Sequence, residues 1–387
     1  MDNTLLDIRL KPAKQQPAWD DPAQLERVRD ELVRRPALVA TEDVRELRAA
    51  LAQVAAGKAL VVQSGDCAED PAECTVAHVA RKTAVLDLLA GALKMTAHQP
   101  VVRIGRIAGQ FAKPRSSDTE RVDGVELPVF RGHMVNSPEP DGDSRRPDPL
   151  RLLTGYMAAA EIMEHLGWHG PRNRVEPPVW TSHEALLVDY EIPMLRRDRD
   201  GRLLLASTHM PWIGERTRQV DGAHVALLAE VVNPVGCKVG PKMERDELLA
   251  LCEKLDPERE PGRLTLIARM GAGTVAAALP PLVTAVREAG HPVVWLTDPM
   301  HGNTVTTPAG VKTRHTETVE REIAEFQAAV RAAGGVAGGL HLETTPDDVV
   351  ECVANSGCRT GRYTSHCDPR LNPGQAVAVT SAWTSAK

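Results

Sequence analysis

Many of the apolar runs in this chain of 387 residues end on a side chain that can bind a ligand. These side chains are Asp66, Cys67, Arg106, His183, Glu184, His209, Lys238, Arg269, Asp298, His301, His341 and Glu343. A charge at the edge of an apolar strand is costly unless it is paired or liganded. Any one of them could simply mark where a strand leaves the core, but their recurrence along the chain favours a shared site.

Four cations from different runs or the loops after them form one chemical subset. They are Arg106, Arg216, Lys238 and Arg269. Arg binds phosphate and carboxylate groups bidentately, so this subset suits an anionic substrate. Salt bridges within the protein are the alternative, and Glu215 beside Arg216 could provide one locally.

A second subset mixes sulfur, nitrogen and oxygen donors. Its members are Cys67, His301, Glu343 and Asp368. Such a set could bind a divalent transition metal. However, no short spacing ties the four together, and a lone Cys or His is more often a buried apolar residue or a hydrogen-bonding partner. The residues by themselves leave both interpretations open.

The apolar runs themselves predict the frame that positions these side chains. We expect strands at 59–65, 100–106, 177–182, 202–208, 234–240, 263–269, 292–298 and 338–343. Near-continuous apolar strands that alternate with amphipathic helices indicate a parallel sheet covered by helices. Eight such units fit a closed α/β TIM barrel, (β/α)8, in which the strand ends meet at the active site. A doubly wound open sheet is the competing fold, but no GxGxxG follows the first strand and no Walker A sequence is present.

Helical patterns fill the intervals between the runs. We expect helices at 22–35, 41–57, 72–95, 148–168, 183–197, 222–232, 244–255, 274–290, 318–334 and 346–357. We therefore predict a short N-terminal helical extension over 1–57 and a catalytic barrel over 58–387. The segment 107–147 is too long for a routine connection and is expected to be a loop that serves the site, with VELPVF as one arm of a small hairpin.

Charge and composition exclude several classes of protein. There are 46 Lys and Arg residues against 52 Asp and Glu, so no global basic field exists to bind nucleic acid or an anionic membrane. No apolar run is long enough for a membrane span, and the N-terminus is too polar for a signal peptide. Seven scattered cysteines do not suggest a disulfide framework. We expect a cytoplasmic protein.

Several motifs resemble the class II 3-deoxy-D-arabino-heptulosonate 7-phosphate (DAHP) synthases. The motifs are QSGDCAE (63–69), RIGRIAGQFAKPRS (103–116), WTSHEALLVDYE (180–191), STHMPWIGERTRQVDGAH (207–224), NPVGCKVGP (233–241), RLTLIARMG (263–271), WLTDPMHGNT (295–304), GLHLETT (339–345) and YTSHCDPRLNPGQA (363–376). They occur in order over most of the chain from residue 60 onward. The resemblance implies a transferase that joins phosphoenolpyruvate, erythrose 4-phosphate and water, releases phosphate, and opens the shikimate pathway toward chorismate and the aromatic amino acids.

The resemblance also assigns roles to residues. By matching positions, the metal ligands are Cys67, His301, Glu343 and Asp368, and they hold a divalent ion such as manganese or cobalt. The matching substrate-binding residues are Arg106, Lys113, Arg115, Ser116, Glu215, Arg216, Lys238 and Arg269. Within these sets, Arg106, Lys113 and His301 are expected to be catalytic, while Arg115 and Ser116 hold the aldose phosphate.

The resemblance is nearest to the short form of the family that is associated with phenazine and related secondary metabolism. It implies weak feedback control by aromatic amino acids and a homo-oligomer, expected to be a dimer. An amino-DAHP synthase, which uses a nitrogen-bearing analogue of erythrose 4-phosphate, is the alternative. Whether Cys67 and Cys367 can form a redox-sensitive disulfide is left open.

Overall fold

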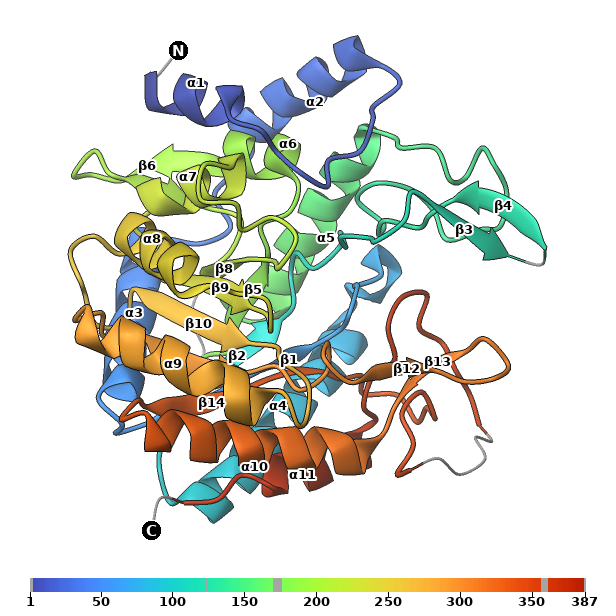
Figure 1. Cartoon of the computed structure of the whole chain (residues 1–387). Helices are drawn as coiled ribbons and strands as arrows, with labels where there is room; N and C mark the ends of the chain where they lie inside the picture. The colour runs from blue at the N-terminus through green and yellow to red at the C-terminus, as the bar shows by residue number, and fades with distance from the viewer. Residues whose placement is uncertain (1–2, 123, 170–175, 356–360, 386–387) are drawn as a thin grey trace. The chain divides into compact units, whose positions relative to one another are not determined.

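Eight parallel strands form a closed barrel in this computed structural model, which describes residues 3–122, 124–169, 176–355 and 361–385 (Figure 1). The strands in their order around the barrel are β1 (Leu60–Gly65), β14 (Ala337–Glu343), β11 (Val294–Thr297), β10 (Leu264–Ala268), β9 (Val235–Val239), β8 (Met210–Ile213), β5 (Trp180–Glu184) and β2 (Val101–Arg106). The predicted TIM barrel is confirmed.

The helices follow the predicted alternation in most places. They are α1 (Asn3–Leu10), α2 (Pro22–Arg34), α3 (Thr41–Ala55), α4 (Val76–Ala97), α5 (Leu150–His165), α6 (Val188–Glu191), α7 (Ala223–Glu230), α8 (Arg245–Leu255), α9 (Val275–Glu288), α10 (Thr316–Ala332) and α11 (Pro373–Ser381), with short 3-10 helices η1 (Pro71–Glu73) and η2 (Ile192–Met194).

The run at 202–208 contains a strand, but the prediction that this strand belongs to the barrel is wrong. Its three leucines form β7 (Leu203–Leu205), which pairs antiparallel with β6 (Leu195–Arg197) outside the barrel. The side chain of Asp198 accepts hydrogen bonds from the backbone N–H groups of Asp200 and Arg202, which closes the turn between these strands. The local hairpin therefore takes this apolar run, and β8 supplies the barrel strand.

Two predicted helices are also wrong. The segment 183–197 contains the end of β5, then α6, η2 and β6, because Pro193 interrupts the helical pattern. The described part of 346–357 has no helix: the backbone of Val353 instead exchanges hydrogen bonds with Arg314 and Thr316. Residues 356 and 357 lie outside the described residues.

The chain divides into two compact units. Unit 1 contains residues 1–44, 68–79 and 107–233, and unit 2 contains 45–67, 80–106 and 234–387. In unit 2, β1 pairs with both β2 and β14, and β10 pairs with β9 and β11. A Cβ on Gly339 would lie 1.9 Å from the carbonyl oxygen of Val61, so this close strand pairing requires glycine.

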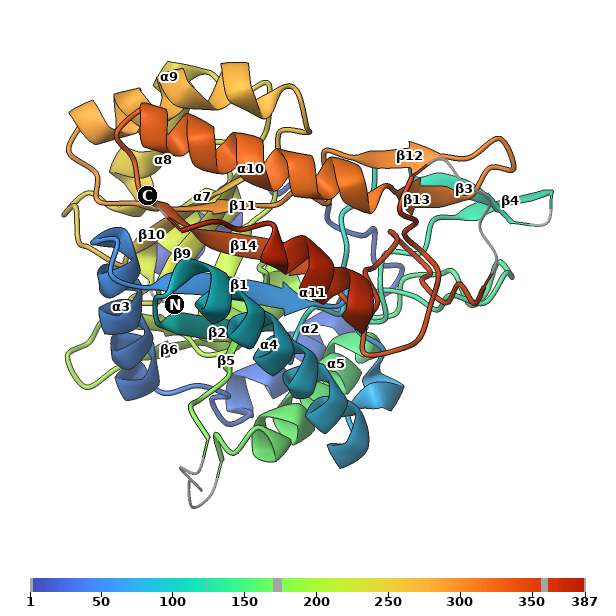
Figure 2. The same cartoon turned by 90° about the horizontal axis from the view of Figure 1, so that it is seen from below.

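Two further hairpins follow barrel strands. In unit 1, β3 (Thr119–Val122) and β4 (Val125–Pro128) pair within the predicted long loop, which confirms the hairpin arm expected there. In unit 2, β12 (Thr304–Thr306) pairs with β13 (Lys312–Arg314), and α9 lies beside α10 (Figure 2).

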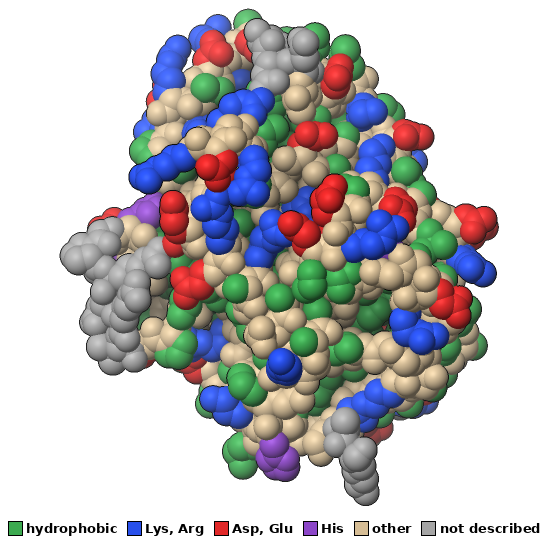
Figure 3. Space-filling model, turned by 90° about the vertical axis from the view of Figure 1, so that its left-hand side faces the viewer, with side chains coloured by type: hydrophobic (Ala, Val, Ile, Leu, Met, Phe, Trp, Pro, Cys, Tyr) green, Lys and Arg blue, Asp and Glu red, His purple; other side chains and the backbone are tan. Residues whose placement is uncertain are grey.

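Surface charge is mixed on the face drawn in Figure 3, where basic and acidic side chains lie among one another. Within the described part of the chain, we find no helix with the length and apolar character needed to traverse a bilayer.

Candidate active site

Three of the four predicted metal ligands lie together in unit 2. The ligand atoms of Cys67, Glu343 and Asp368 are all within 4.8 Å of one another. Cys67 follows β1, Glu343 ends β14, and Asp368 precedes α11. The backbone N–H of Asp368 also donates to Cys67 Sγ at 3.2 Å. Thiolate and carboxylate donors in this arrangement suit a divalent transition metal.

The fourth predicted ligand, His301, contacts this cluster through Glu343. Its Nε2 lies 3.3 Å from Glu343 Oε1, and its Nδ1 lies 2.7 Å from Asp298 Oδ2. A carboxylate behind an imidazole fixes the orientation of the ring and leaves the other nitrogen for a ligand. The observed contacts are therefore compatible with His301 as a metal ligand through Nε2.

Glu343 is fully buried and lies between two cations. Arg106 Nη2 donates to one carboxylate oxygen at 3.1 Å, and Arg314 Nη1 donates to the other at 2.8 Å. Burial alone would lower the pKa of Arg314, but the charge of Glu343 raises it above its ordinary value. These two contacts fix the position of the Glu343 carboxylate, and a carboxylate must be deprotonated to bind a metal.

Asp298 links the imidazole to a buried lysine. Its Oδ2 also accepts a short hydrogen bond from Lys238 Nζ. Burial opposes ionisation of Asp298, but His301 and Lys238 together hold the pKa of this carboxyl well below its usual range. Burial has the opposite sign for the cation and lowers the pKa of Lys238 to about 8.

Arg106 is held in a fixed direction at the end of β2. Its Nε donates to the carbonyl oxygen of Asp66 at 3.1 Å, and its Nη1 lies 2.6 Å from His341 Nε2. Burial, with Lys238 and Arg106 nearby, lowers the pKa of His341 well below its ordinary value. The neutral ring then accepts from Arg106 and donates through Nδ1 to Gln63 Oε1, at 2.7 Å.

Arg269 is less buried than Arg106 and Lys238. It directly follows β10, where its backbone N–H donates to the Val239 carbonyl oxygen at 2.9 Å. Its Nη2 donates to the carbonyl oxygen of His301 at 3.1 Å. Unit 2 therefore brings three predicted substrate cations into the same network as the predicted metal ligands.

A second layer of ion pairs supports the segments that carry Cys67 and Asp368. Arg370 donates to Asp66 Oδ1 at 2.8 Å and to both oxygens of Glu351. Glu351 also accepts the backbone N–H groups of Ser365 and Arg370. Burial works against it, but Arg370 lowers the pKa of Glu351. Glu351 therefore binds the chain on both sides of Asp368, at Ser365 and at Arg370, and fixes the position of this segment.

The remaining predicted substrate residues belong to unit 1. Arg115 donates through Nη2 to Glu120 at 2.9 Å and through Nη1 to the Phe130 carbonyl oxygen at 3.0 Å. Ser116 is exposed, whereas Lys113 is buried, and the backbone N–H of Lys113 donates to Arg131. Arg115 thus has a carboxylate partner on the β3–β4 hairpin.

Glu215 and Arg216 do not pair with each other in unit 1. Glu215 Oε1 instead accepts from Arg218 Nη2 at 2.9 Å. Arg216 is exposed, while Arg218 is buried. The local salt bridge that the sequence allowed is therefore made by a different arginine.

The match to a family model covers residues 3–169 and 162–383, and the model is described as the Class-II DAHP synthetase family. The chain belongs to this family. It is 57% identical over 389 residues to a protein of Pseudomonas fluorescens named probable phospho-2-dehydro-3-deoxyheptonate aldolase, covering 99% of this chain and 97% of that protein. The predicted enzyme, a DAHP synthase of the transferase class, is confirmed by these relationships.

Further relatives agree with the family. A phospho-2-dehydro-3-deoxyheptonate aldolase of Streptomyces coelicolor is 39% identical, with 97% of this chain and 94% of that protein covered. A solved phospho-2-dehydro-3-deoxyheptonate aldolase from Francisella tularensis aligns with a TM-score of 0.55 at 14% identity, covering 95% of this chain and 96% of that one. At that identity the solved structure supports the fold alone.

Sequence reasoning missed several buried groups of this class II DAHP synthetase family member. In unit 2, Arg314 lies outside the barrel strands, on β13, so the strand-end pattern could not indicate it. In unit 1, Glu69 accepts the backbone N–H groups of Ala108, Gly109 and Gln110 at 2.8–3.1 Å. Glu69 stands in the recognised QSGDCAE motif, which was the available signal.

A further buried chain of hydrogen bonds in unit 1 was also missed. His183 Nε2 lies 2.8 Å from Glu191 Oε1, and Ser207 Oγ donates to Glu191 Oε2 at 2.6 Å. The sequence indicates His183 only as a residue at a strand end. The placement of Glu191 and Ser207 beside it depends on α6 and the approach to β8, which the sequence did not resolve.

Proposed function

We propose that this protein catalyses the metal-dependent condensation of phosphoenolpyruvate with erythrose 4-phosphate and water to give DAHP and phosphate. The observation that carries the proposal is the convergence of Cys67, Glu343 and Asp368 beside buried cations in unit 2. Membership of the class II DAHP synthetase family supports the same reaction.

The donor set fits a divalent ion such as manganese or cobalt. Cys67, Glu343 and Asp368 would hold it, and His301 would add Nε2. A divalent metal at this position would supply Lewis-acid activation of the aldehyde of erythrose 4-phosphate. Lys312 Nζ lies 2.9 Å from Asp368 Oδ1, and it would have to share that carboxylate with the ion.

Phosphoenolpyruvate would bind through the cations of unit 2. Arg106 and Lys238 are buried, and Arg269 is partly accessible. Charge-assisted hydrogen bonds to phosphate and carboxylate are about twice as strong as neutral ones. Lys238 and Arg106 are already aimed by Asp298 and His341, so they would bind the substrate with little reorganisation.

The unit 1 assignments rest on the resemblance and extend this proposal. Arg115 and Ser116 would hold the aldose phosphate, and Lys113 would reach the reacting carbon. Glu215 and Arg216 would complete the phosphoenolpyruvate site. Two anionic substrates repel each other, so these groups would offset the repulsion and hold a reactive geometry.

The reaction balances without any redox partner. C3 of the enol phosphate attacks the aldehyde carbon, and the new C–C bond leaves C2 electron-poor. Water adds to C2, and the C–O bond to phosphate then breaks, so that the water oxygen becomes the C2 carbonyl. One proton of the water ends on the former aldehyde oxygen and the other on the departing phosphate. Lys238, with a pKa of about 8, can hold or release a proton close to neutral pH, within reach of the bound anion.

The decisive experiment measures phosphoenolpyruvate consumption and phosphate release with two aldoses. The metal-loaded enzyme should turn over with erythrose 4-phosphate and require a divalent ion. Turnover only with the nitrogen-bearing analogue would identify an amino-DAHP synthase instead. No consumption with either aldose would reject the proposal.

The proposal also covers the location, the oligomeric state and the pathway of this enzyme. We expect a cytoplasmic homodimer of the short, phenazine-associated type that feeds secondary metabolism. Inactivating the gene should then remove a chorismate-derived secondary product while growth without aromatic amino acids continues. Light scattering of the purified protein checks the dimer.

A further inference from the structure

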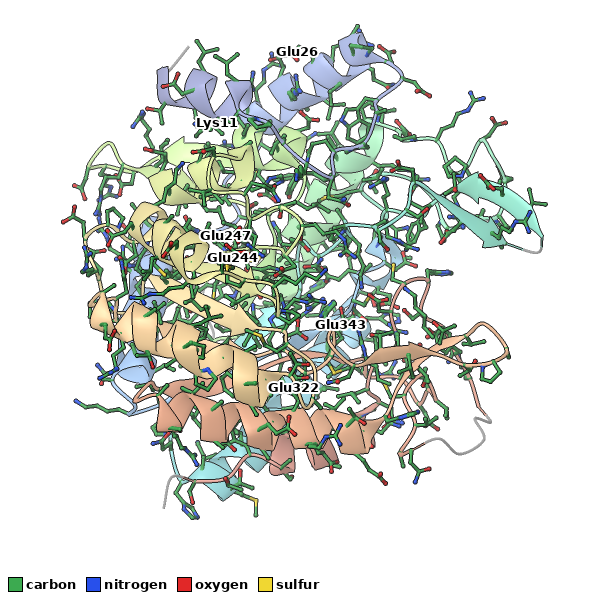
Figure 4. The ribbon with its side chains drawn as sticks, viewed as in Figure 1. Lys11, Glu26, Glu244, Glu247, Glu322 and Glu343 are labelled. Atoms are coloured by element: carbon green, nitrogen blue, oxygen red, sulfur yellow. The ribbon has the colours of Figure 1, made fainter. Side chains whose placement is uncertain are left out.

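A buried carboxylate on α10 lies outside the set of proposed metal ligands and substrate cations. Glu322 is 0% exposed and is labelled together with Glu343 in Figure 4. A carboxylate in the interior is costly unless its oxygens accept hydrogen bonds or meet a cation. The partners of Glu322 therefore indicate what it does.

Within the described part of the chain, the hydrogen-bonding partners of Glu322 are all N–H donors in loops. Oε1 accepts the backbone N–H of Gly271 at 3.0 Å and of Met270 at 3.3 Å. Oε2 accepts Nδ2 of Asn303 at 2.5 Å. Asn303 in turn accepts the backbone N–H of Ala272 through Oδ1 at 3.1 Å. One carboxylate thus joins two loops through a continuous set of hydrogen bonds.

These loops carry a proposed substrate cation and a proposed metal ligand. Arg269 begins the loop after β10, and His301 lies in the loop after β11. Arg269 Nη2 donates to the His301 carbonyl oxygen at 3.1 Å. A Cβ on Gly302 would lie 2.3 Å from the backbone nitrogen of Gly271, so the two backbones are in close contact. A shift of one loop must therefore move the other.

We propose that Glu322 is a positioning residue that fastens the Arg269 loop to the His301 loop. It would set the separation between the phosphoenolpyruvate cation and the metal ligand without touching either substrate. This inference rests on the proposed function, which assigns those roles to Arg269 and His301. The ionised carboxylate is the required form, because its partners are all donors.

The ionisation of Glu322 gives the role a measurable signature. Burial raises the pKa of Glu322 to about 7, and the charge of Asp298 adds to this, whereas the N–H of Gly271 and the amide of Asn303 lower it. The charged side chains on or against the two loops are Arg269, Asp298, His301, Lys238 and Glu343, and Arg321 and Glu325 neighbour Glu322 on α10. As the pH falls through about 7, protonation removes an acceptor and loosens the tie.

The test compares phosphoenolpyruvate binding by wild-type protein and Glu322→Gln, using calorimetry. In this variant the side-chain amide oxygen can still accept the N–H of Gly271, but the amide NH2 group faces the NH2 group of Asn303. Rotating the Asn303 amide would relieve this conflict but place its NH2 group against the backbone N–H of Ala272. We expect the Kd for phosphoenolpyruvate to rise about tenfold at pH 8, as for a lost hydrogen bond to a charged group. At pH 6 the wild-type carboxyl is itself largely protonated, so the two proteins should converge.

Two controls separate this role from general damage. Glu325→Gln makes the same change one turn along α10, where Glu325 accepts the N–H of Gly273 at 2.6 Å but is only partly buried. It should bind phosphoenolpyruvate like wild type at both pH values. The double variant Glu322→Gln with Asn303→Asp restores the hydrogen bond with its direction reversed, because the new carboxylate at position 303 accepts from the new amide at position 322. It should recover most of the affinity for phosphoenolpyruvate.

Asn303→Ala provides a second variant if Glu322→Gln does not fold. It removes the hydrogen bonds that Asn303 forms with Glu322 and Ala272, and it should also raise the Kd for phosphoenolpyruvate. Wild-type affinity in either folded variant at pH 8, or a ratio of Kd values that does not change with pH, would overturn the positioning role. Arg269→Ala distinguishes the source of failure: wild-type affinity there would overturn the proposed site together with this inference.

Discussion

The predicted substrate-binding residues of unit 2 and unit 1 differ in their burial and in the partners that hold them. In unit 2, Arg106 and Lys238 are buried and aimed by His341 and Asp298. In unit 1, Arg216 is exposed, and Arg115 is bound to Glu120 on a hairpin of its own unit. Buried groups with several fixed partners are preorganised, whereas a less buried side chain must lose conformational freedom when it binds. We therefore expect substitutions in unit 2 to have the larger effects on catalysis.

The largest effect should come from losing the metal site. A chelator should abolish turnover and a divalent ion should restore it, because several kcal/mol of Lewis-acid stabilisation correspond to a loss of about a thousandfold or more. His301→Ala should have the same consequence, since Nε2 is removed from the cluster. Steady-state phosphate release measures both.

His78→Ala provides the matched control, because His78 on α4 forms a hydrogen bond with Thr75 and is not one of the proposed metal ligands. It should retain activity. Full turnover of a metal-free sample, or of His301→Ala, would contradict the assignment of this site.

The next largest effect should follow Arg269→Ala. Removing one charge-assisted contact should raise the KM for phosphoenolpyruvate about tenfold to a hundredfold. The KM for the aldose should change much less, and initial-rate kinetics with each substrate varied will separate the two. Arg245→Ala, an exposed arginine at the start of α8, is the control. Equal changes in both KM values would contradict the division between the units.

The pH dependence of Lys238 should give a smaller effect. Because burial lowers the pKa of Lys238 to about 8, the side chain loses its charge as the pH rises through that value. The kcat/KM for phosphoenolpyruvate, which reports the free enzyme, should then fall by up to about tenfold per pH unit. Lys238→Arg should keep its charge and flatten this limb. A wild-type profile that stays flat to pH 9.5 would show that the Lys238 charge is not used.

The smallest effect should follow Arg115→Ala in unit 1. Since Glu120 already holds this guanidinium, we expect the KM for erythrose 4-phosphate to rise by only about threefold to tenfold, as for a modest net hydrogen bond. The KM for phosphoenolpyruvate should not change. Ser117→Ala, at an exposed position of the same loop, is the control. A larger loss than that of Arg269→Ala would reverse the comparison between the units.

The periodic parts of the fold were readable from the sequence. Buried parallel strands such as β9 and β10 are short and mainly apolar. Lys238 lies near the end of β9 and Arg269 directly follows β10, as expected where a barrel exposes strand ends to the site. Recurring motifs then connected these ends to a known family. The leucines of β7 show the limit, since an apolar run by itself does not reveal whether it joins a barrel or a local hairpin.

The tertiary structure alone decided how the site residues are supported. Glu322 lies on α10 and Arg314 ends the hairpin strand β13, and neither is near the end of a barrel strand in the sequence. Each is nevertheless buried against a loop or ligand of the site. Hydrophobic periodicity identifies which face of an element is buried, but it does not specify the partner of a buried charge. That partner depends on which distant segments the closed barrel brings together, and on the need to satisfy every charge it encloses.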